Sequence, residues 1–298
     1  MSMSSEALRD RTQAYFRLLQ TTLCSALESA DGKAAFIRDD WDHEDSGGGT
    51  TRVLENGQVF EKAGVNFSAV TTKLSSRIAE RMNIESQSMF ATGISLVLHP
   101  VSPMIPSVHM NLRYIEPKNG QAWFGGGMDL TPSYLFEDDV RHFHQTLKHA
   151  CDRYDHHWYP RFKKWCDEYF TIPHRCETRG LGGIFFDDLS GNIELMFSFV
   201  QHVGDCFLEA YLPIVQRRKK ESWGTVEKEW QLQRRGRYVE FNLIYDRGTL
   251  FGLETRGRIE SILISLPPSV HWSYDFHPLP GSREQQLQEI LQHPQPWA

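Results

Sequence analysis

A histidine, an asparagine and an arginine alternate along the segment Ser107–Glu116 in a pattern suited to binding and protonating an anion. His109, Asn111 and Arg113 are separated by apolar residues, and successive side chains of a strand point to opposite faces. A strand would therefore place the three polar side chains on one face, roughly 7 Å apart. An imidazole that transfers protons would then lie near a guanidinium that binds carboxylates.

The next β-type run, Gln121–Leu130, carries two features that favour a binding site. Gly125–Gly127 removes the side chains from part of the strand, so that a ligand or another backbone can approach closely. Asp129 follows in a strongly apolar context. We interpret the combined pattern as a site for an anionic small molecule that bears N–H groups, although the solvated outer face of an antiparallel sheet would show the same alternation.

Periodicity and turn signals predict the elements that position these residues. Further β-type runs cover Gly93–His99 and Thr51–Phe60. The segment Arg237–Leu266 is divided by Asp-Arg-Gly and Arg-Gly-Arg turns, which predicts a three-stranded antiparallel meander. Helical stretches are predicted at Ser5–Ala30, Thr71–Arg81, Glu137–Asp152, Trp158–Phe170, Ile193–Lys219, Thr225–Arg235 and Ser282–Gln292. Because most strands are neighbours in sequence, we expect an α+β fold, a single domain over 1–298 with a large, mostly antiparallel β-sheet flanked by helices on both faces.

The composition of the 298-residue chain narrows the class of partner. Its formal net charge of −6 argues against nucleic acid as the main partner, because phosphate binding requires a basic face. No apolar run reaches about 18 residues and the N-terminal MSMSSEALRD has no apolar core, so we expect neither an integral membrane segment nor a signal peptide. Five cysteines without a CxxC pair are typical of reduced thiols in a cytoplasmic protein.

A histidine-based metal site is a weaker hypothesis. His142 and His144 are two residues apart on a predicted helix and face different sides of it. Together with His99, His109 and His174 they could converge in space, but no HExxH spacing fixes such a site. Taken alone, the residues indicate an enzyme that acts on a carboxylated small molecule.

Several blocks of sequence are long enough to compare with known families. They are Gly47–Leu54, Val59–Ser68, His99–Pro100, His109–Arg113, Trp123–Pro132, Tyr159–Cys166, Gly182–Asp188 and Arg235–Asn242. These blocks closely resemble the oxygen-dependent coproporphyrinogen-III oxidase family, and the resemblance runs from about Leu18 to Trp297. Ser46 and Ala122 depart from the glycine and the tryptophan that are usual in the family, and the turn before Gln121 is shorter.

The resemblance implies oxidative decarboxylation of two propionate side chains of coproporphyrinogen III to vinyl groups. The product would be protoporphyrinogen IX, a step of haem biosynthesis, with release of CO₂ and hydrogen peroxide. Molecular oxygen would be the co-substrate and no further cofactor is expected, because the electron-rich pyrrole can reduce oxygen itself. The resemblance also implies a homodimer.

The same resemblance implies roles for individual residues. His109 matches the proton-donor histidine of the family, Arg113 is expected to bind a propionate, and Asp129 is expected to accept pyrrole N–H groups. These three are the predicted catalytic residues. The predicted substrate contacts are Ser95, Asn111, Leu112, Arg113, Gly257, Arg258 and Ile259.

Three further predictions concern the use of a metal ion, two competing functions and the assembly of the chain. Some bacterial members of the family are described as using a divalent ion on histidines that match His99, His109, His144 and His174. We nonetheless predict catalysis without a metal, because no carboxylate–histidine helix motif fixes a geometry. A metal-dependent decarboxylase and a non-enzymatic tetrapyrrole carrier are the competing hypotheses. Apolar residues on both faces of the predicted strands in 239–274 predict an isologous homodimer through this region.

Overall fold

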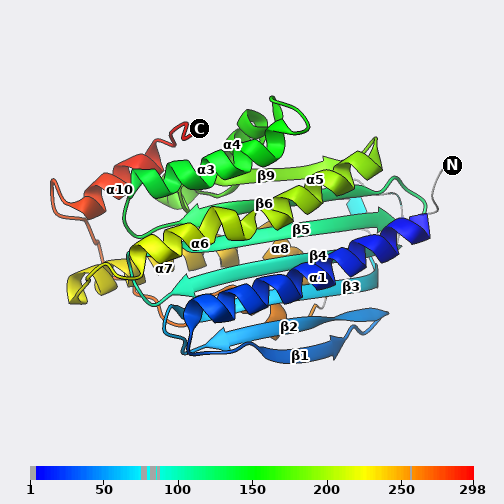
Figure 1. Ribbon diagram of the computed structural model, residues 1–298, viewed down its shortest axis with the longest axis horizontal. Helices are drawn as coiled ribbons and strands as arrows, with labels where there is room; N and C mark the ends of the chain where they lie inside the picture. Colours follow the sequence, from blue (N-terminus) through cyan, green and yellow to red (C-terminus); the bar gives the residue numbers. More distant parts are fainter. Residues whose placement is uncertain (1–4, 75–78, 81–84, 86–87, 256) are drawn as a thin grey trace.

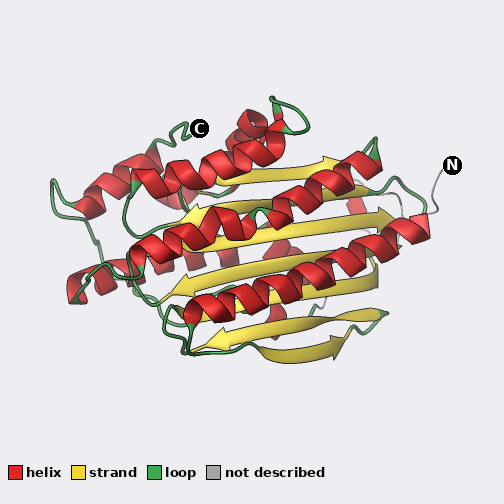
Figure 2. Cartoon of the chain, in the orientation of Figure 1, coloured by secondary structure: helices red, strands yellow, loops and turns green. Residues whose placement is uncertain are grey.

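The computed structural model describes residues 5–74, 79–80, 85, 88–255 and 257–298. Its centre is a seven-stranded sheet in the order β1-β2-β3-β4-β5-β6-β9, and every neighbouring pair is antiparallel. The strands are β1 Ile37–Asp42, β2 Gly47–Glu55, β3 Phe60–Lys73, β4 Ser88–Pro100, β5 Ser107–Pro117, β6 Trp123–Thr131 and β9 Gly183–Leu189. Helices lie on both sides of this sheet, so the predicted α+β class is confirmed (Figure 2).

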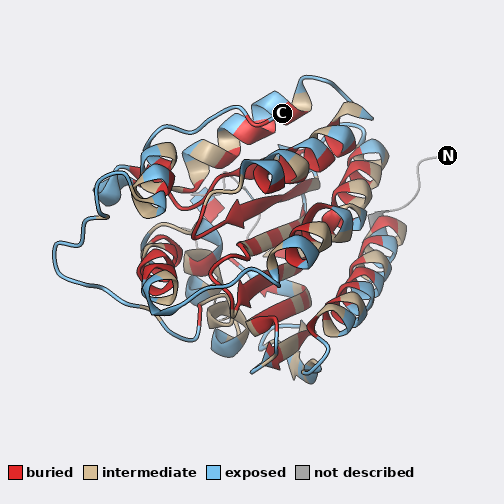
Figure 3. Ribbon diagram, turned by 60° about the vertical axis from the view of Figure 1, so that its left-hand side comes forward, coloured by how far each residue is buried: buried red, intermediate tan, exposed pale blue. Residues whose placement is uncertain are grey.

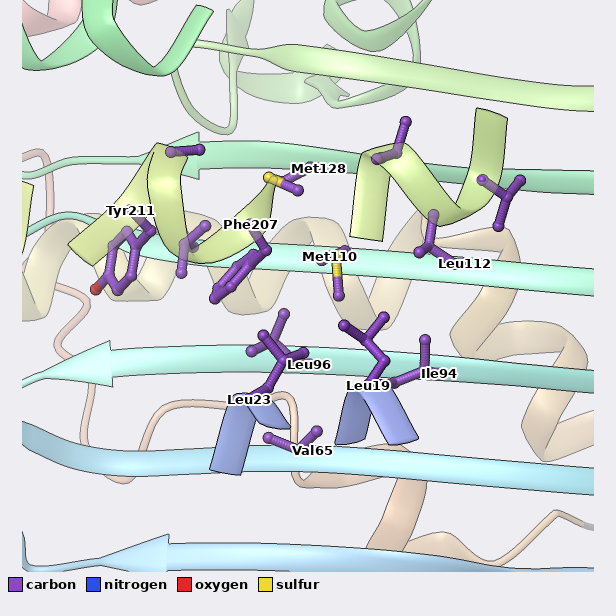
Figure 4. Close-up of a cluster of buried hydrophobic side chains, with 14 of the residues drawn as sticks. Leu19, Leu23, Val65, Ile94, Leu96, Met110, Leu112, Met128, Phe207 and Tyr211 are labelled. Atoms are coloured by element: carbon purple, nitrogen blue, oxygen red, sulfur yellow. The ribbon is translucent and has the colours of Figure 1, made fainter. Parts of the chain in front are cut away.

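One face of the sheet is apolar and carries the main core. The helices α1 (Ser5–Asp31), α5 (Ile193–Asp205) and α6 (Phe207–Arg218) cross this face (Figure 1). Figure 4 shows leucines of α1 and aromatic residues of α6 pointing toward apolar side chains of the strands. The strand residues labelled there are Val65, Ile94, Leu96, Met110, Leu112 and Met128. The alternation predicted for Ser107–Glu116 therefore places its apolar half in the core.

The β9 side of the sheet is closed by α3 (Glu137–Asp152) and α4 (Trp158–Tyr169), and α4 packs along β9. After α4 come the short strands β7 (Thr171–Ile172) and β8 (Glu177–Thr178), separated by the single-turn helix η1 (Pro173–Arg175). The last helix, α10 (Arg283–Gln292), packs against β8. Figure 3 shows buried strands enclosed by helices whose outward surfaces are exposed.

The opposite face of the sheet is rich in glycine and polar residues, and it is covered by α7 (Thr225–Ile244), α8 (Arg247–Glu254) and α9 (Ile259–Leu263). The strand register aligns five polar residues in one row across the sheet. The row runs Asp39, Thr51, Asn66, Ser95, Asn111. Of the described helices, none is long and apolar enough to cross a membrane.

The predicted meander at Arg237–Leu266 is wrong, because this segment is helical. Its buried residues Tyr238, Phe241 and Asn242 are spaced by three and one, as on one side of α7, while Leu243 and Ile244 are exposed. Asp246 then accepts a hydrogen bond from the Thr249 amide and begins α8. The Asp-Arg-Gly sequence is thus a helix start rather than a hairpin turn.

Two other boundaries differ from the predictions. The strand predicted at Thr51–Phe60 divides into the end of β2 and the start of β3, and β3 continues to Lys73. Residues 71–73 belong to β3 rather than to a helix, while 75–78 and 81 of the predicted helix lie outside the described residues. The helix predicted at Ile193–Lys219 is two helices that meet at Cys206.

Candidate active site

The polar side chains of the middle strands form a half-buried floor on the face opposite the main core. In the register of β4, β5 and β6, Ser95 pairs with Asn111, His109 with Asp129, and Arg113 with Gly125. The predicted grouping of His109, Asn111 and Arg113 on one face is therefore found. Leu112 is fully buried in the core on the other face, so only its backbone belongs to the floor.

A chain of four hydrogen-bonded side chains begins at His109. Its Nδ1 lies 2.7 Å from Oδ1 of Asp129, and Oδ2 of Asp129 lies 2.7 Å from Nη2 of Arg179. Arg179 also donates from Nη1 to Oδ1 of Asn242 on α7, at 2.8 Å. Asp129 and Arg179 are almost wholly buried, whereas 21% of the His109 side chain is exposed. The imidazole is thus the end of the chain that solvent or a ligand can reach.

The charge on Asp129 is fixed by its two partners. Burial alone would raise the pKa of this carboxyl, but the guanidinium of Arg179 and the hydrogen bond from His109 together hold it below its ordinary value. An ionised carboxylate only accepts hydrogen bonds, so the contact places a proton on Nδ1 of His109. Nε2 is then the nitrogen available for proton exchange with a ligand.

Aromatic rings hold Arg179 in place. Its guanidinium carbon lies 4.2 Å from the ring centroid of Phe170, 4.5 Å from Tyr238 and 5.0 Å from Phe241. Such cation–π contacts keep a buried guanidinium oriented toward its carboxylate. Arg179 is not among the residues predicted from the sequence. The signal for it was indirect: a carboxylate as apolar in its surroundings as Asp129 requires a cationic partner.

Arg113 is held by a second carboxylate that was also missed. Its Nη2 lies 2.7 Å from Oδ2 of Asp187 on β9, and its Nη1 donates to Oδ1 of Asn111 at 3.0 Å. About a quarter of each charged side chain is exposed (26% for Arg113, 22% for Asp187). The pairing of β9 with β6 is what brings Asp187 to the floor.

A further arginine lies beside the same floor. The guanidinium carbon of Arg247, at the start of α8, is 4.8 Å from the ring centroid of Tyr169 and 6.0 Å from that of Phe185. The guanidinium carbon of Arg113 is 5.9 Å from the Phe185 centroid. Two arginines therefore flank one phenylalanine of β9, and cations in this arrangement attract an anionic ligand.

The predicted contacts at Gly257–Ile259 lie at the far end of the polar row. Arg258 pairs with Asp39 of β1 at 2.5 Å, four strands from β5 and hence roughly 19 Å away at about 4.8 Å per strand. Ser261 of α9 covers the middle of the row, because it contacts both Thr51 and Asn66. The structure does not bring Arg258 into contact with His109, and Ile259 is exposed.

The four histidines that match the family's described metal set do not converge. His99 is bonded to Ser107 and to the Ser265 carbonyl, and His144 to Tyr159 and the Leu181 carbonyl. His174 contacts Tyr245 and Glu240 near the surface. Within the described part of the chain, no group of three or more His, Cys, Asp or Glu side chains is arranged to hold a metal ion. These histidines therefore do not fit a shared metal site.

One comparison with known proteins bears on identity. A family model described as Coproporphyrinogen III oxidase matches residues 11–297 of the 298. The match includes all of the floor and the hydrogen-bonded chain from His109 to Asn242. It also includes the Arg113–Asp187 and Arg258–Asp39 pairs. The chain therefore belongs to the coproporphyrinogen III oxidase family, oxidoreductases that decarboxylate coproporphyrinogen III oxidatively in haem biosynthesis.

Proposed function

We propose that the floor formed by β4, β5 and β6 binds coproporphyrinogen III and that molecular oxygen is the oxidant. Each propionate would lose CO₂, one side-chain proton and two electrons to become a vinyl group. Oxygen would take up the two electrons with that proton and one further proton to give hydrogen peroxide. The product after two rounds is protoporphyrinogen IX. The observation that carries this proposal is the partly exposed imidazole of His109, held by a buried Asp129–Arg179 pair close to Arg113.

The floor supplies separate groups for binding and for proton transfer. Arg113 and Asn111 bind one propionate through charge-assisted hydrogen bonds. Arg258 would bind a carboxylate at the opposite end of the tetrapyrrole. His109 exchanges a proton at Nε2 with the substrate as electrons leave the ring.

Asp129 acts through His109 in this proposal. The sequence analysis expected Asp129 to accept pyrrole N–H groups directly. Its side chain is 2% exposed, and both of its oxygens already accept hydrogen bonds, from His109 and from Arg179. We therefore assign it the work of fixing the tautomer of His109 and stabilising the imidazolium that forms.

The oxidant and the two competing hypotheses are tested in one experiment. Coproporphyrinogen III is incubated with the enzyme under air, under nitrogen, and under air after dialysis against a chelator. We expect vinyl product under air with or without chelation, one oxygen consumed per vinyl group, and no product under nitrogen. Product formed under nitrogen would exclude oxygen as the oxidant. Activity lost on chelation would favour a metal-dependent decarboxylase, and binding without turnover would favour a carrier.

We also propose a homodimer through 239–274, on different grounds from the predicted meander. This part of the chain carries a group of large, exposed hydrophobic side chains on α7, α8, α9 and the segment that follows. They are Leu243, Ile244, Leu253, Ile259, Trp272 and Tyr274. A contiguous apolar patch typically marks a protein–protein interface, and we propose that these side chains contribute to one. Sedimentation at micromolar concentration should give twice the chain mass of 34.5 kDa, and a single monomeric species would contradict the proposal.

A cytoplasmic location is proposed from the cysteines. All five are free, and Cys24, Cys151 and Cys166 are buried as thiols. Burial raises the pKa of the Cys24 thiol to about 12, so it is an unreactive, reduced side chain. Fractionation of the source cells, with the activity followed in each fraction, tests the location.

A further inference from the structure

We propose that Asp187 is a positioning residue for substrate binding, because it fixes the direction in which Arg113 presents its guanidinium. This inference rests on the proposed role of Arg113 in binding a propionate. Asp187 does not itself bind substrate in this view. It determines how Arg113 does.

The backbone of β9 aims Asp187 at Arg113. Phe124 of β6 pairs with Leu189 of β9, and Gly126 pairs with Phe186. The two paired positions are therefore two residues apart on β6 but three residues apart on β9. The extra residue is a β-bulge, a feature that redirects a side chain where a strand pair is interrupted. Phe186 and Leu189 are both buried in the core, although an odd spacing would place them on opposite faces of a regular strand. The bulge at Asp187–Asp188 therefore preserves the core and leaves the Asp187 carboxylate on the floor.

The carboxylate of Asp187 is fixed at both oxygens. Oδ2 pairs with Nη2 of Arg113, and Oδ1 accepts a hydrogen bond from the amide of Asp188 at 3.1 Å. Asp188 itself has a positive φ of 54°, a conformation that aspartate tolerates better than most residues. A carboxylate held by its own backbone is a rigid partner, in contrast to one on a flexible surface side chain.

Gly125 lets the ion pair lie flat on the sheet. A Cβ atom at this position would be 2.3 Å from Oδ1 of Asp187 and 2.8 Å from both Nε and Nη2 of Arg113. Any side chain there would displace the pair. Gly125 faces Arg113 across the strand pair. The absence of a side chain at this position thus leaves room for the arginine–aspartate pair as well as for the ligand.

The remaining hydrogen-bond donors of Arg113 follow from this arrangement. A guanidinium has five N–H groups in a rigid planar fork. One bond goes to Asp187 and one to Asn111, on two different nitrogens, so the plane of the fork is fixed. A propionate then meets N–H groups that are already oriented, which reduces the entropy lost on binding. Without Asp187 the long side chain would sample other rotamers, and substrate affinity would fall.

The test is a double-mutant cycle on steady-state kinetics. Asp187→Asn keeps the shape of the side chain and removes its charge. We expect it to raise KM about five- to tenfold while kcat changes less than about threefold, because binding is affected and the chemical step is not. In an Arg113→Gln background the same Asp187→Asn change should leave KM within about twofold, since no arginine remains to be positioned.

Asp188→Asn is the matched control. It makes the same charge change one residue away, at an exposed side chain whose side-chain oxygens are not the ones that pair with Arg113. It should leave KM within about twofold, and melting curves should show that all variants are folded at the assay temperature. A fall in KM for Asp187→Asn would show that Asp187 competes with substrate for Arg113 and would overturn the proposal. An equal KM increase in both backgrounds would assign Asp187 a general structural role instead.

The cycle also separates this inference from the proposed function. If Arg113→Gln alone leaves KM unchanged, Arg113 does not bind a propionate and the proposed function of that residue fails. If Arg113→Gln raises KM but Asp187→Asn does not, only the positioning role fails.

Discussion

His109 and Asp129 lie directly opposite each other on β5 and β6, and Nδ1 of the imidazole is 2.7 Å from the carboxylate oxygen Oδ1. A directly paired position in an antiparallel sheet gives two side chains the same face and close Cβ atoms. The orientation of the imidazole is thereby built into the two most central strands of the site. The carboxylate is buried and the imidazole is partly exposed, so only the imidazole end of the pair can reach a ligand.

Replacement of His109 tests proton transfer. His109→Ala should lower kcat by on the order of 10²–10⁴ if the imidazole exchanges a proton in the rate-limiting step. A residue that only hydrogen-bonds substrate would cost about 1 kcal/mol, or a factor of about five. His109→Gln, which keeps a polar side chain without the titration, should be as slow as His109→Ala. A kcat within about threefold of the wild type for either variant would remove His109 from the chemistry.

Asp129→Asn should reduce both stability and turnover. It leaves Arg179 buried without a charged partner, which typically costs about 3–5 kcal/mol. It also removes the negative charge that stabilises an imidazolium, so kcat should fall by roughly 10²-fold with a smaller change in KM. Activity is measured well below the melting temperature of the variant.

Glu177→Gln is the control for the stability effect. Glu177 pairs with the buried Arg234 at 2.6 Å, in another buried carboxylate–arginine contact that does not involve His109. This variant should melt early as well, but its kcat should stay near that of the wild type. An Asp129→Asn variant that melts early and yet turns over normally while folded would show that Asp129 has only a structural role.

The sequence allowed the floor to be predicted but not what holds it. The alternation of His109, Asn111 and Arg113 is a local pattern with period two, and β5 has it. Asp187 and Arg179 reach the site through pairings between segments far apart in the chain, and no local period encodes such pairings. Only the cost of burying Asp129 without a partner pointed to a missing cation.

The error at Arg237–Leu266 has a related cause. Short runs of β-branched and aromatic residues between glycines have the composition of hairpins, and tertiary contacts overrode that propensity. Tyr238 and Phe241 pack against the guanidinium of Arg179, and this contact requires the helical spacing of three. The helical spacing at this point of α7 thus allows two of its aromatic rings to contact one buried arginine from another segment.

Arg113 and Arg258 should contribute independently to substrate binding. Each is expected to hold a different carboxylate at opposite ends of the polar row, roughly 19 Å apart by strand spacing. Arg113→Ala and Arg258→Ala should each raise KM by roughly 10–150-fold, the effect of about 1.5–3 kcal/mol for a charge-assisted hydrogen bond. Sites this far apart and without shared partners have additive free energies, so the double variant should show the product of the two increases.

Arg38→Gln is the control for overall charge. Arg38 is 61% exposed on β1, and its carboxylate partner is Asp40. It should leave KM unchanged within about twofold at moderate ionic strength. Additive increases for Arg113 and Arg258 with no effect of Arg38 would support two specific carboxylate contacts. An unchanged KM for Arg258→Ala would remove α9 from the substrate site.

Asp31 is expected to control stability without affecting catalysis. It is the last residue of α1, it is buried, and its carboxylate accepts hydrogen bonds from five backbone amides. Oδ1 accepts from residues 33, 34 and 58, and Oδ2 accepts from residues 59 and 60. Gly57 allows this approach, because a Cβ there would be 2.3 Å from Oδ2. One carboxylate thus joins the end of α1 to the connection between β2 and β3.

The five backbone amides also determine how the stability contributed by Asp31 changes with pH. Burial alone would raise the pKa of Asp31, but the backbone hydrogen bonds outweigh it and the pKa in the folded protein lies below its ordinary value. A carboxyl with a lower pKa in the folded state stabilises the protein above the pKa of the unfolded chain, about 3.9. That contribution is lost as the pH falls through the folded-state pKa.

Asp31→Asn should therefore lower the free energy of unfolding at pH 7 by about 2–4 kcal/mol, because the new NH₂ group cannot accept from two buried amides. Denaturant unfolding at pH 7 and at several values below pH 4 measures the difference between the two proteins. This difference should shrink as the pH falls, since protonation of Asp31 removes the same charge from the wild type. Asp10→Asn, on an exposed position of the same helix, should have little effect at any pH. A difference between wild type and Asp31→Asn that stays constant with pH would show that the ionised carboxylate is not what holds the β2–β3 connection.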